Sequence, residues 1–128
     1  IILKLGFFGV LMGLVTIMGW GQNMELFTWL FMIIAASVII KKNIQKHLFI
    51  HCMLIGLSWG VDCTIIQAIF FDLFRVNNPT YGLENLSQFM FPAELILISI
   101  GIIIGVISGI VLWATQKIIK ITDEKPKL

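Results

Sequence analysis

Charged side chains are scarce in this sequence. Asp, Glu, Lys and Arg make up 12% of the 128 residues, whereas hydrophobic residues make up 59%. A water-soluble domain of this length with so many apolar side chains would expose large apolar patches and aggregate. The shortage of charge therefore excludes an ordinary soluble domain, and it predicts that a lipid bilayer is the solvent for most of the chain.

Cysteine is almost absent, since the sequence contains only Cys52 and Cys63. Both lie in one apolar run, at a separation that corresponds to about 16 Å along a helix. The Cα atoms of a disulfide lie within about 7 Å of each other. We therefore expect two buried free thiols, and the lack of a C-x-x-C pair excludes a thiol-oxidising membrane bundle.

Motifs of catalysis and of cofactor binding are also missing. The sequence contains no H-E-x-x-H motif, no glycine-rich phosphate loop and no basic groove interleaved with aromatic residues. His47 and His51 would share one helix face, but Cys52 would point about 100° away from them, and zinc requires three or four ligands. We therefore expect no enzyme, no cofactor, no metal site and no nucleic-acid partner.

Four long apolar runs dominate what the sequence does contain. A membrane-crossing helix needs about 20 apolar residues, so the runs predict spans at about 3–20, 25–40, 48–74 and 93–115. The predicted fold is all-α, with one transmembrane domain over residues 1–128 in which four helices form an up-down-up-down bundle. The third run is longer than a perpendicular crossing needs, so we expect that helix to tilt or to protrude.

Basic residues are distributed very unevenly around these spans. Arg75 lies at one end of the predicted bundle. The lysines lie at the other end, namely Lys4, Lys41, Lys42, Lys46, Lys117, Lys120, Lys125 and Lys127. Basic residues near helix ends resist translocation, so this bias predicts that both termini are cytoplasmic. The excess of lysine over arginine and the many isoleucines are typical of an AT-rich microbial genome, so we expect the inner or plasma membrane of a microbe.

The longest predicted connection is an external loop over residues 75–92. Within it, the segment 83–91 places apolar residues at helical spacing, with polar residues between them. This pattern predicts either a short amphipathic helix on the outer membrane surface or an irregular loop. Pro92 and Glu94 then favour a helix start, because proline suits the first helical turn and an acid suits the positive end of the helix dipole.

Glycines recur at four-residue spacing in three of the predicted spans. They are Gly9 and Gly13, Gly56 and Gly60, and Gly101, Gly105 and Gly109. Small residues at this spacing allow two membrane helices to approach closely. The pattern predicts helix packing, either inside the four-helix unit or between copies of the chain through the last span. We therefore expect a homo-oligomer or an assembly with other membrane subunits, within the lipid bilayer.

Asp62 is the most informative single residue, because it lies deep within the third predicted span. A carboxyl group at the centre of a membrane helix costs about 2.5–3.5 kcal/mol on insertion scales, so it should face protein or water. No Lys or Arg lies at its depth in the predicted spans. The residue is therefore either a charge-switching group for transport or a structural acid that bonds to a neighbouring helix.

Helical geometry adds three residues to this hypothesis. His47, His51, Ser58 and Asp62 fall within about 60° of one another around the third span. This polar stripe begins at the cytoplasmic end and passes the middle of the span, and histidine titrates near neutral pH. We predict a polar pathway to Asp62 in a small channel or transporter subunit for protons, cations or small solutes. The alternative is a non-catalytic accessory or scaffold subunit of a larger membrane complex.

Overall fold

The computed structural model describes residues 1–20, 24–83, 85 and 90–119, and this part of the chain is built of helices. In chain order they are α1 (Ile2–Ile17), α2 (Glu25–Asn43), α3 (Leu48–Ile69), α4 (Phe71–Asn77), the short 3₁₀ helix η1 (Pro79–Tyr81) and α5 (Ala93–Ile118). No strand occurs among the described residues. The predicted all-helical fold class is therefore confirmed.

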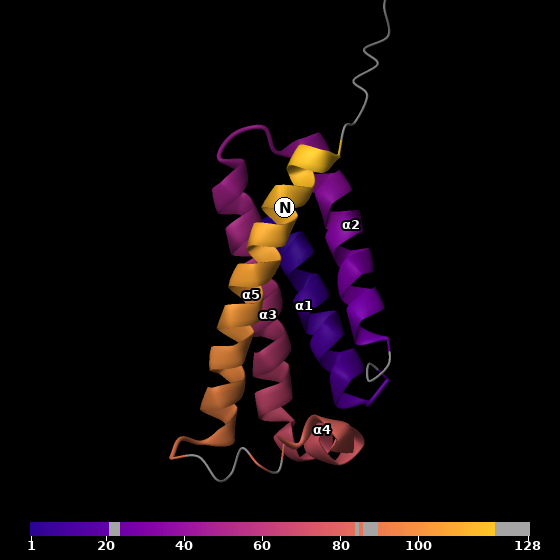
Figure 1. Cartoon of the computed structure of the whole chain (residues 1–128), viewed down its shortest axis with the longest axis vertical. Coiled ribbons are helices and arrows are strands. Elements are labelled where there is room, and N and C mark those ends of the chain that lie inside the picture. Colours follow the sequence, from indigo (N-terminus) through magenta and orange to yellow (C-terminus); the bar gives the residue numbers. More distant parts are fainter. Residues whose placement is uncertain (21–23, 84, 86–89, 120–128) are drawn as a thin grey trace, which may run out of the picture.

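The four long helices stand side by side, and α4 lies across one end of them (Figure 1). The connection from α2 to α3 and the last turn of α5 lie at the opposite end from α4. Two helices, α3 and α5, are long and apolar enough to cross a membrane, and α1 is a shorter apolar helix. This pair gives weak support for membrane insertion, whereas four crossings stay a prediction.

Glycines bring α3 and α5 into backbone contact. A Cβ atom added to Gly60 would lie 2.0 Å from the carbonyl oxygen of Gly101, and one added to Gly56 would lie 2.3 Å from the amide nitrogen of Gly109. Gly105 completes the contact, because a Cβ atom there would lie 2.9 Å from the oxygen of Gly56. The glycine ridge of α5 therefore packs inside the chain, and an oligomer would have to form through another face.

The seam between α1 and α3 combines glycines with a buried tryptophan. A Cβ atom on Gly9 would lie 2.7 Å from the Cα atom of Trp59, and one on Gly13 would lie 3.1 Å from the oxygen of Cys63. The Trp59 side chain is fully buried, and its Nε1–H donates a hydrogen bond of 2.6 Å to the oxygen of Leu5. The same tryptophan belongs to the central apolar cluster of the bundle.

The apolar run 48–74 forms two helices, whereas the sequence predicted one long helix that tilts or protrudes. α3 ends at Ile69, and the backbone of Phe70 leaves the α-helical region with φ −106° and ψ 38° before α4 begins. Phe74 of α4 is buried against Leu83 and Leu97. After the break, this side chain lies against Leu97 near the start of α5.

The end of α4 also completes the end of α1. The side-chain amides of Asn77 and Asn78 donate hydrogen bonds of 2.9 and 2.7 Å to the carbonyl oxygens of Ile17 and Thr16. The last carbonyls of a helix lack the partner that the next turn would give them. The oxygen of Thr16 also accepts a bond of 3.1 Å from the amide of Gly19, so the asparagine bonds add to the capping of α1 and join α4 to it. The break after α3 is therefore stabilised by polar contacts far away in sequence.

Part of the predicted external loop is described, and part is not. The loop contains the end of α4, the helix η1 and Gly82, whose φ of +62° suits a residue without a side chain. The predicted interfacial helix over 83–91 lies mostly outside the described residues. As predicted, Pro92 immediately precedes a helix, and Glu94 lies in the first turn of α5.

Candidate functional site

Two of the four predicted pathway residues lie together at the seam between α1 and α3. Ser58 and Asp62 are both half-buried and face Gly6. A Cβ atom on Gly6 would lie 3.4 Å from the Cβ atom of Ser58 and 3.8 Å from Oδ2 of Asp62. Within the described part of the chain, Asp62 makes no hydrogen bond or ion pair. The carboxyl group therefore remains available to a group outside this part of the chain.

The register of α1 and α3 sets the depth of Asp62. Gly9 packs against Trp59 and Gly13 against Cys63, so Asp62 lies between these two glycines in depth. Lys4 lies about 10 Å from that level along the helix axis. The side chain of Lys4 is exposed, and the described residues form no ion pair between it and Asp62.

The two histidines lie at the start of α3. His47 precedes the helix with a left-handed backbone, φ 52°, and the ring Nδ1–H of His51 donates to the oxygen of His47 over 2.9 Å. His51 lines an open hollow together with Ile1, Ile2 and Leu3. It is about 10 Å along the helix from Ser58. The structure thus brings the four residues together as two separate pairs, and a continuous pathway stays a prediction.

A different feature lies between α2 and α5. The two helices are joined toward their ends, where the amide of Gln116 donates to the oxygen of Ser37 over 3.1 Å, and beside this contact they leave a recess. Its volume is about 490 Å³, which is within the range for sites that bind one small molecule. The lining residues come from α2, α5 and η1, and they are Glu25, Leu26, Trp29, Ile33, Tyr81, Ile104, Ile107, Ser108 and Val111. Neither Asp62 nor Ser58 belongs to this recess.

A second compartment continues from the recess toward α3. It has a volume of about 270 Å³ and shares Glu25, Trp29, Tyr81 and Ile104 with the first. Its inner wall adds residues of α3 such as Thr64 and Gln67, along with Gly101 of α5. The two compartments therefore form one two-part recess, open at the side and closed toward the bundle core.

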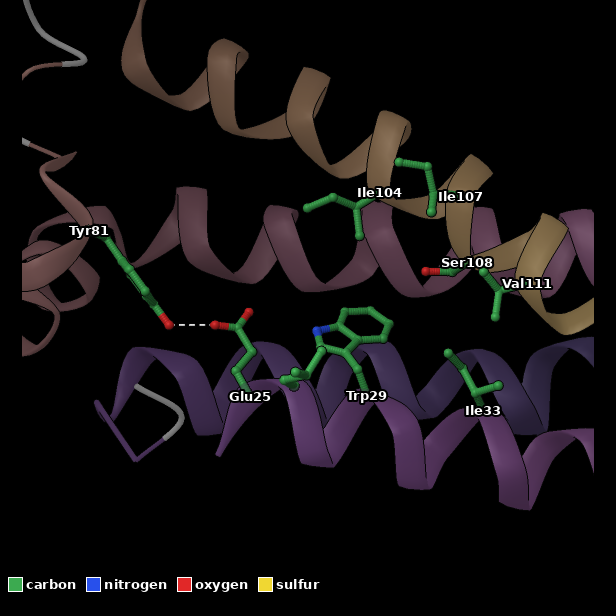
Figure 2. Close-up of a pocket in the computed structure, with 9 residues that line it drawn as sticks. Glu25, Trp29, Ile33, Tyr81, Ile104, Ile107, Ser108 and Val111 are labelled. Carbon is green, nitrogen blue, oxygen red and sulfur yellow. Dashed lines mark hydrogen bonds between the residues drawn. The ribbon is translucent and has the colours of Figure 1, made fainter. Parts of the chain in front are cut away.

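Polar atoms gather at one end of this recess. The hydroxyl group of Tyr81 donates a hydrogen bond to the Glu25 carboxylate, as Figure 2 shows. Partial burial raises the pKa of the Tyr81 phenol, and the bond to Glu25 and the negative charge of that carboxylate raise it further. The phenol, which is protonated at neutral pH in any tyrosine, therefore keeps its proton to a higher pH than a free tyrosine does.

The aromatic ring of Trp29 forms the adjoining wall. Figure 2 shows the indole on α2 between Glu25 and Ile33, on the side that faces α5. Its ring is tilted by 54° against Trp59, and the ring centroids are 6.0 Å apart. Since Trp59 is fixed by its bond to Leu5, Trp29 rests on a rigid support.

The other polar side chains of the inner compartment are already bonded within the chain. Thr64 donates to the oxygen of Gly60 over 2.9 Å, and the amide of Gln67 donates to the hydroxyl group of Thr16 over 3.0 Å. Because these groups bond to their own bundle, the Glu25–Tyr81 pair is the most exposed polar feature that a guest molecule would meet. No group of three potential metal ligands occurs among the described residues.

Sequence reasoning missed this recess. Glu25 was recognised only as the start of a span, and nothing in the sequence indicates that it meets Tyr81, the one tyrosine of the chain. Glu25 is one of several acids at the end predicted to be external, and Tyr81 lies within the predicted loop, so neither residue stands out by its position. No family model matches this chain, and no curated protein or solved structure is significantly similar to it.

Proposed function

We propose that this chain is a small transporter, or a transporter subunit, that accepts an amphiphilic solute from the bilayer through the recess between α2 and α5. In this proposal four helices cross the inner or plasma membrane of a microbe, and both termini are cytoplasmic. The observation that carries the proposal is the recess itself. It is apolar along its length, it opens at the side, and one carboxylate–phenol pair lies at its end.

Binding followed by release fits this set of groups better than chemical conversion does. The polar groups that line the recess are a hydrogen-bonded acid and phenol, together with a few amide, hydroxyl and thiol groups. Side chains of Gln67 and Thr64 already bond within the bundle. A site that holds a solute through apolar contact and one charge is suited to carrying it.

A second candidate function rests on Asp62. This carboxyl group is half-buried at the α1–α3 seam, lies beside Ser58, and has no bonding partner within the described residues. An accessory subunit of a larger membrane complex would present such a group to a polar or basic side chain of a partner helix. The predicted proton or cation pathway would use the same residue in a different way.

Reconstitution separates these proposals, because the two carboxylates lie at different places. Wild type, Glu25→Gln and Asp62→Asn would be placed in liposomes, and the uptake of labelled cationic, anionic and neutral amphiphiles would be measured alongside proton flux. Transport through the recess predicts uptake that Glu25→Gln abolishes and Asp62→Asn retains.

The other outcomes contradict that proposal in different ways. Flux that only Asp62→Asn abolishes would favour the polar pathway over the recess. Uptake and proton flux at the level of empty liposomes in all three proteins would end the transport proposal and favour the accessory subunit. Circular dichroism of each variant would verify that its helices are intact.

A further inference from the structure

We infer that the α2–α5 recess binds one hydrophobic cation, with its charge held by Glu25 beside the rings of Trp29 and Tyr81. This inference rests on the proposed function, since it names the class of solute that would be carried. The occupant is a small membrane-dissolved cation. A two-chain phospholipid is excluded as the intended occupant, because the recess has the volume of one small ligand.

The charge of the lining determines the sign of the occupant. Among the described residues that line the two compartments, Glu25 is the acidic one, and none is a Lys, Arg or His. One carboxylate oxygen of Glu25 accepts the bond from Tyr81. The described residues give no basic partner to this carboxylate. A positive charge at this position would therefore neutralise it, whereas a negative charge would be repelled.

The aromatic groups select a cation of low hydration. A positive charge over an indole or phenol face is attracted by the ring quadrupole, most strongly when it is removed from water. Trp29 and Tyr81 both line the recess next to Glu25 (Figure 2). A strongly hydrated metal ion would lose its water shell there for two rings and one carboxylate, so an organic cation is favoured.

The apolar length of the recess accommodates the rest of the molecule. Ile33 of α2 and Ile104, Ile107 and Val111 of α5 line it away from the charged end. The three α5 residues are exposed, so their side chains would be covered by the body of the ligand. Because lipid is as apolar as these side chains, covering them adds shape complementarity and little driving force. The charge pair with Glu25 and the contacts with the rings are therefore the main sources of affinity.

The test uses two probes of the same shape and opposite charge, tetraphenylphosphonium and tetraphenylborate. Binding of each labelled probe to the full chain in detergent would be measured by equilibrium dialysis. We expect saturable binding of the phosphonium, little saturable binding of the borate, and affinity for the phosphonium that is about tenfold weaker in Glu25→Gln, because a contact with a charged group is lost. Trp29→Leu should weaken it in the same direction.

Asp62→Asn and Glu94→Gln are the matched controls, because each removes a carboxylate outside the recess, and both should bind like wild type. Equal affinity for both probes, or unchanged affinity in Glu25→Gln and Trp29→Leu, would overturn the inference. The result is separate from that of the transport proposal. Selective phosphonium binding without flux in liposomes supports this site and contradicts transport, whereas flux without phosphonium selectivity does the reverse.

Discussion

Two sides of α5 show how side-chain size determines the structure of this bundle. Toward α3, glycines at every fourth position allow the two backbones to touch. Toward α2, the residues Ile104, Ile107 and Val111 face a recess of about 490 Å³. On the face of α5 toward α3, the backbones touch without intervening side chains. On the face toward α2, large side chains line an open recess.

The difference separates rigidity from accessibility. A contact between backbones has no side chain that can rotate away. The α3–α5 interface therefore cannot relax by changes of side-chain rotamer, and the two helices are fixed against each other. An open recess between large side chains allows a guest to enter without separating the glycine contact. The bundle thus has a fixed half, made by α1, α3 and α5, against which the recess is formed.

The largest expected effect comes from breaking the glycine contact. In Gly60→Ala the new Cβ atom would lie 2.0 Å from the oxygen of Gly101, which is backbone and cannot rotate away. We expect a loss of about 3 kcal/mol or more in unfolding free energy, as for severe overpacking. Thermal or denaturant unfolding in detergent, followed by circular dichroism, measures it.

The control is the same substitution at Gly6→Ala, where the nearest atom is 3.4 Å away and contact is ordinary. Alanine is also the better helix former by about 1 kcal/mol, so this variant should be at least as stable as wild type. Equal stability of the two variants would show that the α3–α5 contact is looser than the structure has it.

This contact was within reach of the sequence, whereas the recess was not. Four-residue glycine spacing is a local pattern, so Gly56 and Gly60 could be recognised as packing residues before their partners were known. The Glu25–Tyr81 contact joins residues far apart in the chain, and its existence depends on how α2 leans against α5. Likewise, no proline or glycine lies at Phe70 to indicate the break in the sequence. The break is instead stabilised by contacts of Phe74 and Asn78 with residues far away in the chain.

The axial register between α1 and α3 also could not be predicted from the sequence, because each span was identified separately. Hydropathy locates each helix but contains no information on how far one slides along its neighbour. That sliding is determined by the fit of Gly9 against Trp59 and by the bond from Gln67 to Thr16. The depth of Asp62, between Gly9 and Gly13, follows from this register, and hydropathy alone does not give it.

A smaller effect should follow from breaking a polar contact in the fixed half. Thr16→Val keeps the shape of the side chain but removes the hydroxyl group that accepts the hydrogen bond from Gln67. Both residues are buried, so the amide of Gln67 loses this partner, and we expect a loss of about 1–3 kcal/mol in unfolding free energy. The same unfolding assay measures it.

Thr28→Val is the control for that change, because the hydroxyl group of Thr28 bonds only to the oxygen of Met24 in its own helix and is exposed. Its effect should stay within about 0.5 kcal/mol. Similar losses in both variants would mean that the α1–α3 bond has no special role in holding the fixed half together.

Filling the recess should change binding while leaving stability nearly unchanged. Ile107→Trp places a larger ring in the recess from an exposed position on α5, so we expect a change in unfolding free energy within about 0.5 kcal/mol. Phosphonium binding should weaken, because the ring occupies the volume of the ligand. Ile103→Trp is the matched control on an exposed position outside the recess, and equal binding by both variants would contradict the assigned site.

The smallest effect concerns the titration of Tyr81, which absorbance at 295 nm can follow because the chain has no other tyrosine. A free tyrosine titrates near pH 10, and partial burial and Glu25 raise the pKa above that value in the folded chain. The folded state therefore keeps its proton at a pH where the unfolded state loses it. The stability from this contact is complete below about pH 10 and is lost as the pH rises through the folded-state pKa.

Glu25→Gln sharpens this last comparison, because it removes the negative charge but leaves the burial. The folded-state pKa of Tyr81 should move back toward 10 without reaching it, since burial is the largest cause of the shift. A wild-type midpoint equal to that of the unfolded chain would contradict the contact. If Glu25→Gln leaves the titration midpoint of Tyr81 unchanged, the carboxylate does not lie beside the phenol. Glu25 and Tyr81 would then not form the charged end of the recess together.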